Sequence, residues 1–143
     1  MEDAVRATAP RSASEPVLDV FIVEGSAAVR ERLEELVASV RGARCAGTAA
    51  TAEAAIRGIR ARRPAAVVLD IKLEQGSGFD VLRALRKSRS ETPVYVLSNF
   101  TDEPYRRAAL QLGAAAVLDK SAQIERLREL LDAQAARLGR SPH

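Results

Sequence analysis

The segment AAVVLDIKLEQGSGFD, at residues 65–80, contains three different sequence patterns in succession. It opens with a continuous apolar run that ends on an acid, Asp70, and such runs are typical of strands covered on both faces. A loop that contains Gly76 and Gly78 follows. Apolar residues then return at helical spacing, and they are Phe79, Leu82 and Leu85. We therefore predict a buried strand over 65–70, a loop, and an amphipathic helix.

The same order of strand and helix extends in both directions along the chain. Apolar runs at 20–23, 94–97 and 115–118 predict three more buried strands, and the half-polar segment 43–49 predicts an edge strand. Apolar residues at helical spacing follow each strand. The polar residues expected to cap helices are Ser26, Thr51, Thr101 or Asp102, and Ser121. The residues expected to end helices are Gly42, Pro64 and Gly113.

Five strands that alternate with five helices predict an α/β fold, a three-layer sandwich of the (βα)5 type. The sheet should be open and parallel, because a helix connects each strand to the next. We expect one domain over residues 17–138, a flexible N-terminal tail over 1–16 and a C-terminal tail over 139–143. In such sheets the ligand site lies at the carboxyl ends of the strands, so the residues just after the strands are the candidates for function.

The composition argues against several kinds of site. The 143 residues include one cysteine, Cys45, and one histidine, His143. An intrachain disulfide, a multi-cysteine zinc site and a serine–histidine triad are therefore not expected. No apolar run approaches the ~20 residues of a membrane helix, and the N-terminal segment lacks an apolar signal core. A cytoplasmic protein without membrane contact is the expectation.

The charge balance is only mildly basic. Lys and Arg total 22 against 19 Asp and Glu, which gives a formal net charge of +3. The basic residues are scattered over segments such as 62–63, 106–107 and 126–128, and aromatic residues make up 3% of the chain. Nucleic-acid-binding proteins usually cluster basic groups or add stacking aromatics. We therefore expect no nucleic-acid partner and interpret these arginines as solvated helix faces.

Four side chains suited to phosphoryl chemistry follow the predicted strands: Glu24, Asp70, Ser98 and Lys120. Taken singly, each has an ordinary structural interpretation as a cap, a turn hydroxyl or a surface charge. Because the carboxyl ends of parallel strands meet at one edge of a sheet, we expect the four to converge. Two acids, a hydroxyl and an ammonium suit a site where a carboxylate accepts a phosphoryl group and the donors stabilise its oxygens.

Three motifs resemble those of one known family. VVLDIKL at 67–73 with GSGFDVL at 76–82 resembles a phosphoacceptor strand and the loop after it. VYVLS at 94–98 resembles the strand that carries the hydroxyl, and LGAAAVLDKS at 112–121 resembles the strand that carries the lysine. In this order and at these separations, they make the chain similar to a response-regulator receiver domain of two-component signalling. The resemblance implies a flavodoxin-like sheet with strand order 2-1-3-4-5.

The resemblance also implies roles for single residues. Asp70 would accept phosphate from a histidine kinase or a phosphotransfer protein, and it would be the single phosphorylation site. Ser98 and Lys120 would contact the phosphoryl group, and Glu24 would belong to the acid pocket. A downstream protein partner would dock on the face of the fourth helix, fifth strand and last helix, and a second copy of the chain is another candidate partner. Residues expected on that face are Arg106, Arg107 and Ala116.

The sequence departs from the family pattern at four positions. Gly25 replaces the second of two adjacent acids. Glu74 and Ser121 stand where prolines are usual, and Val117 stands where the family has a switch aromatic. The usual coupling between the hydroxyl and that aromatic is therefore not expected.

The missing acid bears on the metal that the family binds. Glu24 and Asp70 would hold Mg²⁺ only weakly, because this ion demands near-octahedral oxygen ligation and dehydrates reluctantly. Lys120 adds a positive charge to the pocket, and Lys72 would add another as a metal substitute if its side chain turns inward. The alternative, in which Lys72 points into solvent, agrees equally well with the sequence.

Three functions compete. The first is a stand-alone receiver that acts as a phosphorylation-controlled switch, with output through a partner because no output region follows in this sequence. The second is a pseudo-receiver, an unphosphorylated interaction or dimerisation module. Gly25 favours it, and the presence of Asp70, Ser98 and Lys120 opposes it. An enzyme is not expected. A dehalogenase-type phosphatase would need an acid where Lys72 stands, and a flavodoxin would need a Ser/Thr-rich loop at residues 24–28.

Overall fold

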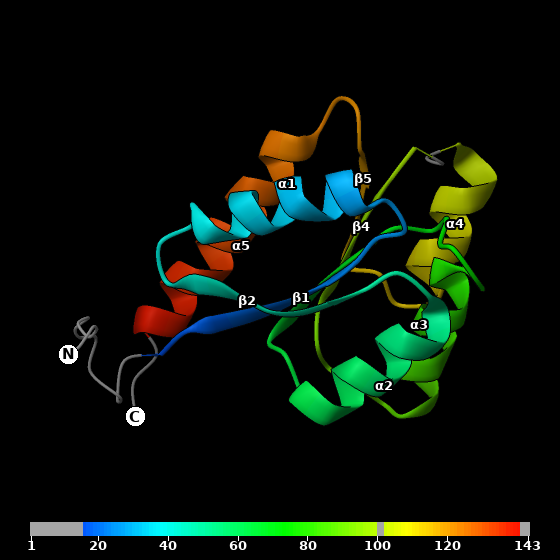
Figure 1. Cartoon of the computed structure of the whole chain (residues 1–143), viewed down its shortest axis with the longest axis horizontal. Coiled ribbons are helices and arrows are strands. Elements are labelled where there is room, and N and C mark those ends of the chain that lie inside the picture. Colours follow the sequence, from blue (N-terminus) through cyan, green and yellow to red (C-terminus); the bar gives the residue numbers. More distant parts are fainter. Residues whose placement is uncertain (1–15, 100–101, 141–143) are drawn as a thin grey trace.

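The computed structural model describes residues 16–99 and 102–140. It contains a five-stranded parallel sheet in the order β2-β1-β3-β4-β5 and five helices, as predicted (Figure 1). The strands are β1 (Leu18–Val23), β2 (Ala43–Ala49), β3 (Ala66–Leu69), β4 (Val94–Ser98) and β5 (Ala116–Asp119). The helices are α1 (Ala27–Ala38), α2 (Ala52–Arg62), α3 (Gly78–Lys87), α4 (Glu103–Gln111) and α5 (Ile124–Arg140). Within the described residues, no helix combines the length and the apolar character that a membrane span requires.

The helices form two layers, one on each face of the sheet. α1 and α5 cover one face, and α2, α3 and α4 cover the other (Figure 1). The side chains of β1 show the division: Val20 and Ile22 belong to the core under α1 and α5, whereas Phe21 and Val23 belong to the core under α2 and α3. Successive side chains of a strand point to opposite faces, so a continuous apolar run supplies both cores.

The sheet brings the ends of its two central strands together. β1 pairs with β3 as far as Val23 and Leu69, so Glu24 and Asp70 follow at adjacent positions of the same edge. β4 and β5 are paired in parallel and end at this edge as well. The strand order 2-1-3-4-5 therefore places the site in the centre of the carboxyl edge.

Two of the predicted helix caps are confirmed. The hydroxyls of Ser26 and Thr51 each accept a hydrogen bond from the backbone N–H three residues later, at 3.3 and 3.2 Å. Such bonds satisfy donors that the first turn of a helix leaves unpaired. Asp102 precedes α4 without a side-chain capping bond, and Thr101 lies outside the described residues.

The predicted helix boundaries are wrong at two places. α1 ends at Ala38, before Gly42, which instead forms a later turn with φ of +85°. α5 begins at Ile124, so Ser121 is not its cap. The Ser121 hydroxyl donates to Asp119 Oδ1 at 2.7 Å, and this local bond holds it in the turn before the helix. α5 continues to Arg140.

Two glycines make room for Phe21, the largest of the fully buried side chains. A Cβ atom added at Gly47 of β2 would lie 2.8 Å from the Phe21 ring, and one added at Gly58 of α2 would lie 2.5 Å from it. Both distances are well inside van der Waals contact. The ring is therefore enclosed by backbone from the edge strand and from α2, and it sets how closely α2 packs on the sheet.

We predict that Gly58→Ala destabilises the fold although alanine is the better helix former. The new methyl group would overlap Phe21, and such overpacking costs about 1–3 kcal/mol. Gly139→Ala in α5 is the matched control, since no described atom lies within 4 Å of its added Cβ, and it should be neutral or stabilising by up to ~1 kcal/mol. Urea unfolding of both variants measures the difference. Equal stability of the two variants would contradict the proposed packing of Phe21.

Candidate functional site

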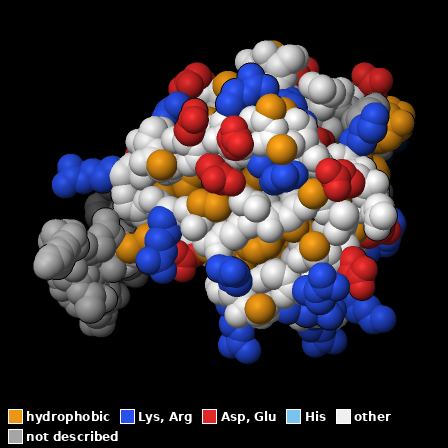
Figure 2. Space-filling view, in the orientation of Figure 1, with side chains coloured by type: hydrophobic (Ala, Val, Ile, Leu, Met, Phe, Trp, Pro, Cys, Tyr) orange, Lys and Arg blue, Asp and Glu red, His pale blue; other side chains and the backbone are white. Residues whose placement is uncertain are grey.

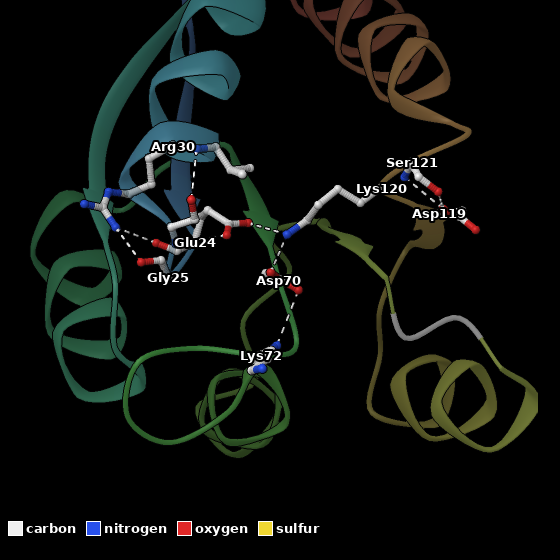
Figure 3. Close-up of polar contacts among 10 residues, drawn as sticks. Glu24, Gly25, Arg30, Asp70, Lys72, Asp119, Lys120 and Ser121 are labelled. Atoms are coloured by element: carbon white, nitrogen blue, oxygen red, sulfur yellow. Dashed lines mark hydrogen bonds and ion pairs between the residues drawn. The ribbon is translucent and has the colours of Figure 1, made fainter.

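Three charged side chains meet at the carboxyl edge of the sheet (Figure 3). The Lys120 ammonium bonds Asp70 Oδ2 at 2.6 Å and Glu24 Oε1 at 2.9 Å. Glu24 and Asp70 follow the neighbouring strands β1 and β3, whereas Lys120 follows the edge strand β5 and reaches them with its long side chain. The two carboxylates are 3% and 5% exposed, so they share one cation away from bulk water.

The two carboxylates are held to different degrees. The second oxygen of Glu24, Oε2, accepts a hydrogen bond from the Ser26 backbone N–H at 3.1 Å. The second oxygen of Asp70, Oδ1, has only a long contact of 3.4 Å with the Lys72 backbone N–H. Glu24 is therefore bonded at both oxygens, and Asp70 has one oxygen that is weakly held and available for chemistry.

The pKa values of two groups in this cluster are raised. Burial raises the pKa of Glu24, against the hydrogen bonds from Lys120 and Ser26, which lower it. Burial acts to lower the pKa of Lys120, but its hydrogen bonds to Asp70 and Glu24 prevail and raise it above the usual 10.5. Lys120 is consequently a cation throughout the physiological range.

The cluster opens onto a hollow of about 390 Å³. Besides the three charged residues, its walls are Gly25, Ser26, Lys72, Leu73, Glu74 and Asn99. The Lys72 side chain is exposed at the mouth, and among the described residues no ion pair involves it. Because Lys72 is exposed and also lines the hollow, its role as a metal substitute stays a prediction. The Lys72 backbone, rather than its ammonium, contacts Asp70 (Figure 3).

Ser98 comes close to the cluster through its backbone. Its carbonyl accepts a hydrogen bond from the Lys120 N–H at 3.0 Å, which joins the ends of β4 and β5. The residue is fully buried, and the wall of the hollow at this strand is the next residue, Asn99. Asn99 was not among the residues predicted from the sequence. It follows the predicted hydroxyl residue, Ser98, and nothing in the sequence pattern distinguishes it from an ordinary polar loop residue.

Arg30 is a second residue that the sequence did not indicate. Its guanidinium, on the first turns of α1, donates to the carbonyl oxygens of Glu24 at 2.8 Å and of Gly25 at 3.3 Å (Figure 3). It therefore clamps the backbone of the loop that carries the buried acid. A sequence shows that a basic residue follows this loop, but the direction of a long flexible side chain depends on what the fold places within its reach.

Gly78 packs against the backbone of Asp70. A Cβ atom at this position would lie 2.5 Å from the Asp70 carbonyl oxygen, and the Gly78 N–H donates to Ile71 at 2.7 Å. The start of α3 thus rests directly on the backbone of Asp70. Ser77 and Asp80 fix this start through a capping box, in which each side chain bonds the backbone of the other.

The donor set does not fit Mg²⁺. Both oxygens of Glu24 and one of Asp70 are already bonded within the protein, and Gly25 has no side chain to offer. Over the described ranges, no group of three or more His, Cys, Asp or Glu residues is placed to hold a metal. Because Mg²⁺ needs several oxygen ligands in near-octahedral geometry, this cluster is not built to provide them.

The sequence matches the response regulator receiver domain family over residues 20–132. It is similar to the probable C4-dicarboxylate response regulator DctR of Bacillus subtilis, with 28% identity over 113 residues, 79% of this chain and 50% of that protein. It is also similar to the transcriptional regulatory protein DcuR of Escherichia coli, with 32% identity over 117 residues, 80% of this chain and 49% of that protein. The chain thus spans about half the length of these two relatives.

Solved structures share the fold. The response regulator domain of Thermotoga maritima CheB aligns with a TM-score of 0.73 and 22% identity, over 89% of this chain and 99% of that chain. A DNA-binding response regulator of the LuxR family from Staphylococcus aureus aligns with a TM-score of 0.77 and 22% identity, over 83% of this chain and 99% of that chain. At these identities the likeness shows the flavodoxin-like architecture and no more.

We predict that Lys120→Met destabilises the protein in a pH-dependent way. Loss of the shared cation leaves two buried carboxylates, so the free energy of unfolding should fall by about 3 kcal/mol near pH ~7. The pKa of Glu24, already raised by burial, should rise further. A raised folded-state pKa costs stability above it, so the loss should shrink as the pH falls toward the ordinary value of 4.5.

Urea unfolding at about pH 7 and about pH 5 measures this dependence. The control is the same Lys120→Met change in a Glu24→Gln, Asp70→Asn background, where no buried charge is left behind and the cost should be much smaller. A loss of equal size at both pH values and in both backgrounds would show that Lys120 acts through packing alone.

Proposed function

Because the chain belongs to the response regulator receiver domain family, we propose that it is a signalling switch whose state is set by a phosphoryl group on Asp70. One observation carries the proposal. Asp70 lies at the end of a central strand, with one oxygen bonded to a buried ammonium and the other weakly held at a hollow. Receiver domains are signalling modules rather than enzymes, and a lasting covalent mark on a single carboxylate suits that role.

The proposed transfer uses Asp70 Oδ1 as the nucleophile. This oxygen forms a bond to the phosphorus of a phosphohistidine, carried by a histidine kinase or a phosphotransfer protein. The phosphorus–nitrogen bond breaks, its electron pair stays on the imidazole nitrogen, and that nitrogen takes a proton from solvent. The product is an acyl phosphate on Asp70 and a neutral histidine on the donor.

The surrounding groups would stabilise the transferred charge. Lys120 is already 2.6 Å from Oδ2, so its ammonium is placed to pair with the phosphoryl oxygens. The backbone N–H of Lys72 points at Oδ1 and adds a donor. Ser98 is proposed as the hydroxyl donor to the phosphoryl group, and Asn99 beside it contributes an amide at the wall of the hollow.

Output would pass through α4, β5 and α5 to a protein partner in the cytoplasm, or to a second copy of the chain. α4 suits a movable or docking element, because Ala109 is its single buried residue. Tyr105 and Leu110 on this helix are 41% and 42% exposed, which gives the face an apolar component. Arg106 links α4 to β5 by donating to the Val117 carbonyl at 2.9 Å, and Arg107 pairs with Glu103 within the helix.

The second candidate function is the pseudo-receiver. The observation that favours it is the donor set, in which Gly25 offers no ligand and Lys120 occupies both acids. On this alternative the three charges form a structural ion cluster, and the domain acts through binding alone. Phosphorylation of Asp70 distinguishes the two functions.

We predict that a small phosphodonor such as acetyl phosphate adds one phosphoryl group to the wild type and none to Asp70→Asn. Intact mass before and after incubation measures the product. Asp119→Asn is the matched control, because Asp119 also ends a strand but lies outside the buried cluster, and this variant should be phosphorylated like the wild type. Undiminished transfer to Asp70→Asn would refute the site, and an unmodified wild type would establish the pseudo-receiver.

We predict that Mg²⁺ has little effect on the wild type and that Gly25→Asp changes this. A Cβ at residue 25 would lie 3.3 Å from the Glu74 backbone nitrogen, so a small shift of that loop admits the side chain. The new carboxylate should tighten Mg²⁺ binding by at least about tenfold. Mutation of a residue that only supports a metal ligand already changes metal affinity by ~10–100-fold. Calorimetric titration and phosphorylation rate are the measurements.

The control for this prediction is Gly25→Asn, which matches aspartate in size and lacks its charge. It should leave Mg²⁺ binding close to that of the wild type. If the wild type binds Mg²⁺ as tightly as Gly25→Asp and is not phosphorylated without it, then Glu24 and Asp70 suffice as ligands and the inference from the donor set is wrong.

A further inference from the structure

Two arginines adopt a backbone conformation that is usual for glycine. Arg63 has φ of +48° and Arg89 has φ of +58°, and the other described residues with positive φ are glycines. Arg63 is the residue after α2, and Arg89 follows Ser88, the residue after α3. The left-handed conformation at helix ends favours glycine because a Cβ atom crowds the backbone there. A strained residue of the same type near the ends of two neighbouring helices points to a role for its side chain.

Both arginines lie at the edge of the molecule opposite the phosphoryl pocket. α2 and α3 return along the sheet, so their C-terminal ends meet at its amino edge. A hollow of about 500 Å³ there is lined by Arg60 and Arg63, and an adjoining hollow of about 260 Å³ is lined by Arg86 and Arg89. The two hollows share the walls Leu85, Ser90 and Thr92. We call these four arginines, Arg60, Arg63, Arg86 and Arg89, the arginine cluster.

The arginine cluster lacks the acidic partners that other arginines of the same helices have. Arg57 of α2 pairs with Glu53, and Arg83 of α3 pairs with Asp80, at 3.3 and 2.8 Å. All four members of the cluster are exposed, and within the described part of the chain none of them forms an ion pair. Figure 2 shows Lys and Arg side chains gathered along the lower edge, over α2 and α3. Arginines from the ends of two helices thus form one cationic surface, whereas the basic segments 106–107 and 126–128 lie on α4 and α5.

Helix dipoles explain only part of this surface. Cations in the last turn of a helix are favourable, which accounts for Arg60 and Arg86. The same effect does not require arginine at the two left-handed positions. Glycine there would relieve the strain, and the cations in the last helical turns would still interact favourably with the dipoles. Arg63 and Arg89 are therefore better explained by a ligand that uses their charge.

We propose that the arginine cluster is a docking site for a carboxylate-rich segment of a partner protein. Guanidinium groups bind carboxylates through paired, parallel hydrogen bonds, and four of them around two adjoining hollows match a short acidic segment. The site lies at the opposite edge from Asp70, so it would bind whether or not that residue is phosphorylated.

A nucleic acid fits the cluster less well. Phe21 and Tyr95 are buried in the core, and Phe79 and Tyr105 stack on each other at the first turns of α3 and α4. No described aromatic ring therefore lies beside the cluster to stack on bases, as single-strand binders require. The compact arrangement around two helix ends also differs from the extended basic track that a duplex backbone needs.

The test compares two double variants of the full chain that each remove two positive charges, either just after α2 and α3 or within these helices. Binding of a fluorescently labelled polyglutamate peptide is followed by anisotropy, with labelled duplex DNA at the same salt concentration as a second probe. Arg63→Gly with Arg89→Gly should weaken peptide binding by about tenfold. Arg57→Ala with Arg83→Ala removes paired arginines and should weaken it by less than about twofold.

Stability provides a second readout that separates binding from folding. The glycine variant relieves the left-handed strain, so its thermal midpoint should equal or exceed that of the wild type while its peptide binding falls. Asparagine also tolerates this conformation, so the double variant Arg63→Asn with Arg89→Asn should keep its thermal midpoint and lose peptide binding as the glycine variant does. The proposal is overturned if the glycine and asparagine variants both lower the thermal midpoint, or if the glycine variant keeps wild-type peptide binding. It is also overturned if the paired-arginine control loses as much peptide binding as the glycine variant, or if duplex DNA binds more tightly than the peptide.

Discussion

The ammonium of Lys120 holds the carboxyl edge of the sheet together. It extends from the end of the edge strand and bonds the acids at the ends of both central strands, at 2.6 Å to Asp70 and 2.9 Å to Glu24. Two buried carboxylates on adjacent strands repel each other and lose hydration, so a cation between them stabilises this edge. Arg30 and Gly78 complete the arrangement, since one clamps the loop of Glu24 and the other lets α3 rest on the backbone of Asp70.

The same ion cluster also sets the chemistry of the pocket. Both oxygens of Glu24 accept hydrogen bonds within the protein, so this side chain acts as a fixed negative charge. Asp70, in contrast, has one oxygen that is only weakly hydrogen-bonded. A phosphoryl group on that oxygen would compete with Glu24 for Lys120, so the lysine couples the modified residue to the ends of β1 and β5. In the proposed switch, a residue of the chain itself would supply much of the positive charge that phosphoryl transfer needs.

The two edges of the sheet differ in the charged groups that they carry. Helices in this fold begin at the carboxyl edge, where the acid cluster and the hollow lie, and end at the amino edge. Cations are favourable at helix C-termini, and the ends of α2 and α3 carry arginines even at the left-handed positions of Arg63 and Arg89. The proposed carboxylate-binding surface and the proposed phosphoryl pocket would thus lie at opposite ends of the strands.

The local patterns of the sequence predicted an open parallel sheet in which Glu24, Asp70 and Lys120 meet, and the resemblance to the receiver family added the strand order 2-1-3-4-5. Apolar runs, helical spacing and strand ends are local patterns, and a parallel sheet carries every strand end to one edge. Only the tertiary structure decided what flexible side chains reach: Arg30 bonds the carbonyls of the acid loop, and arginines from the ends of α2 and α3 gather at one edge. Those directions depend on atoms supplied by elements far apart in the chain, and no local periodicity records them.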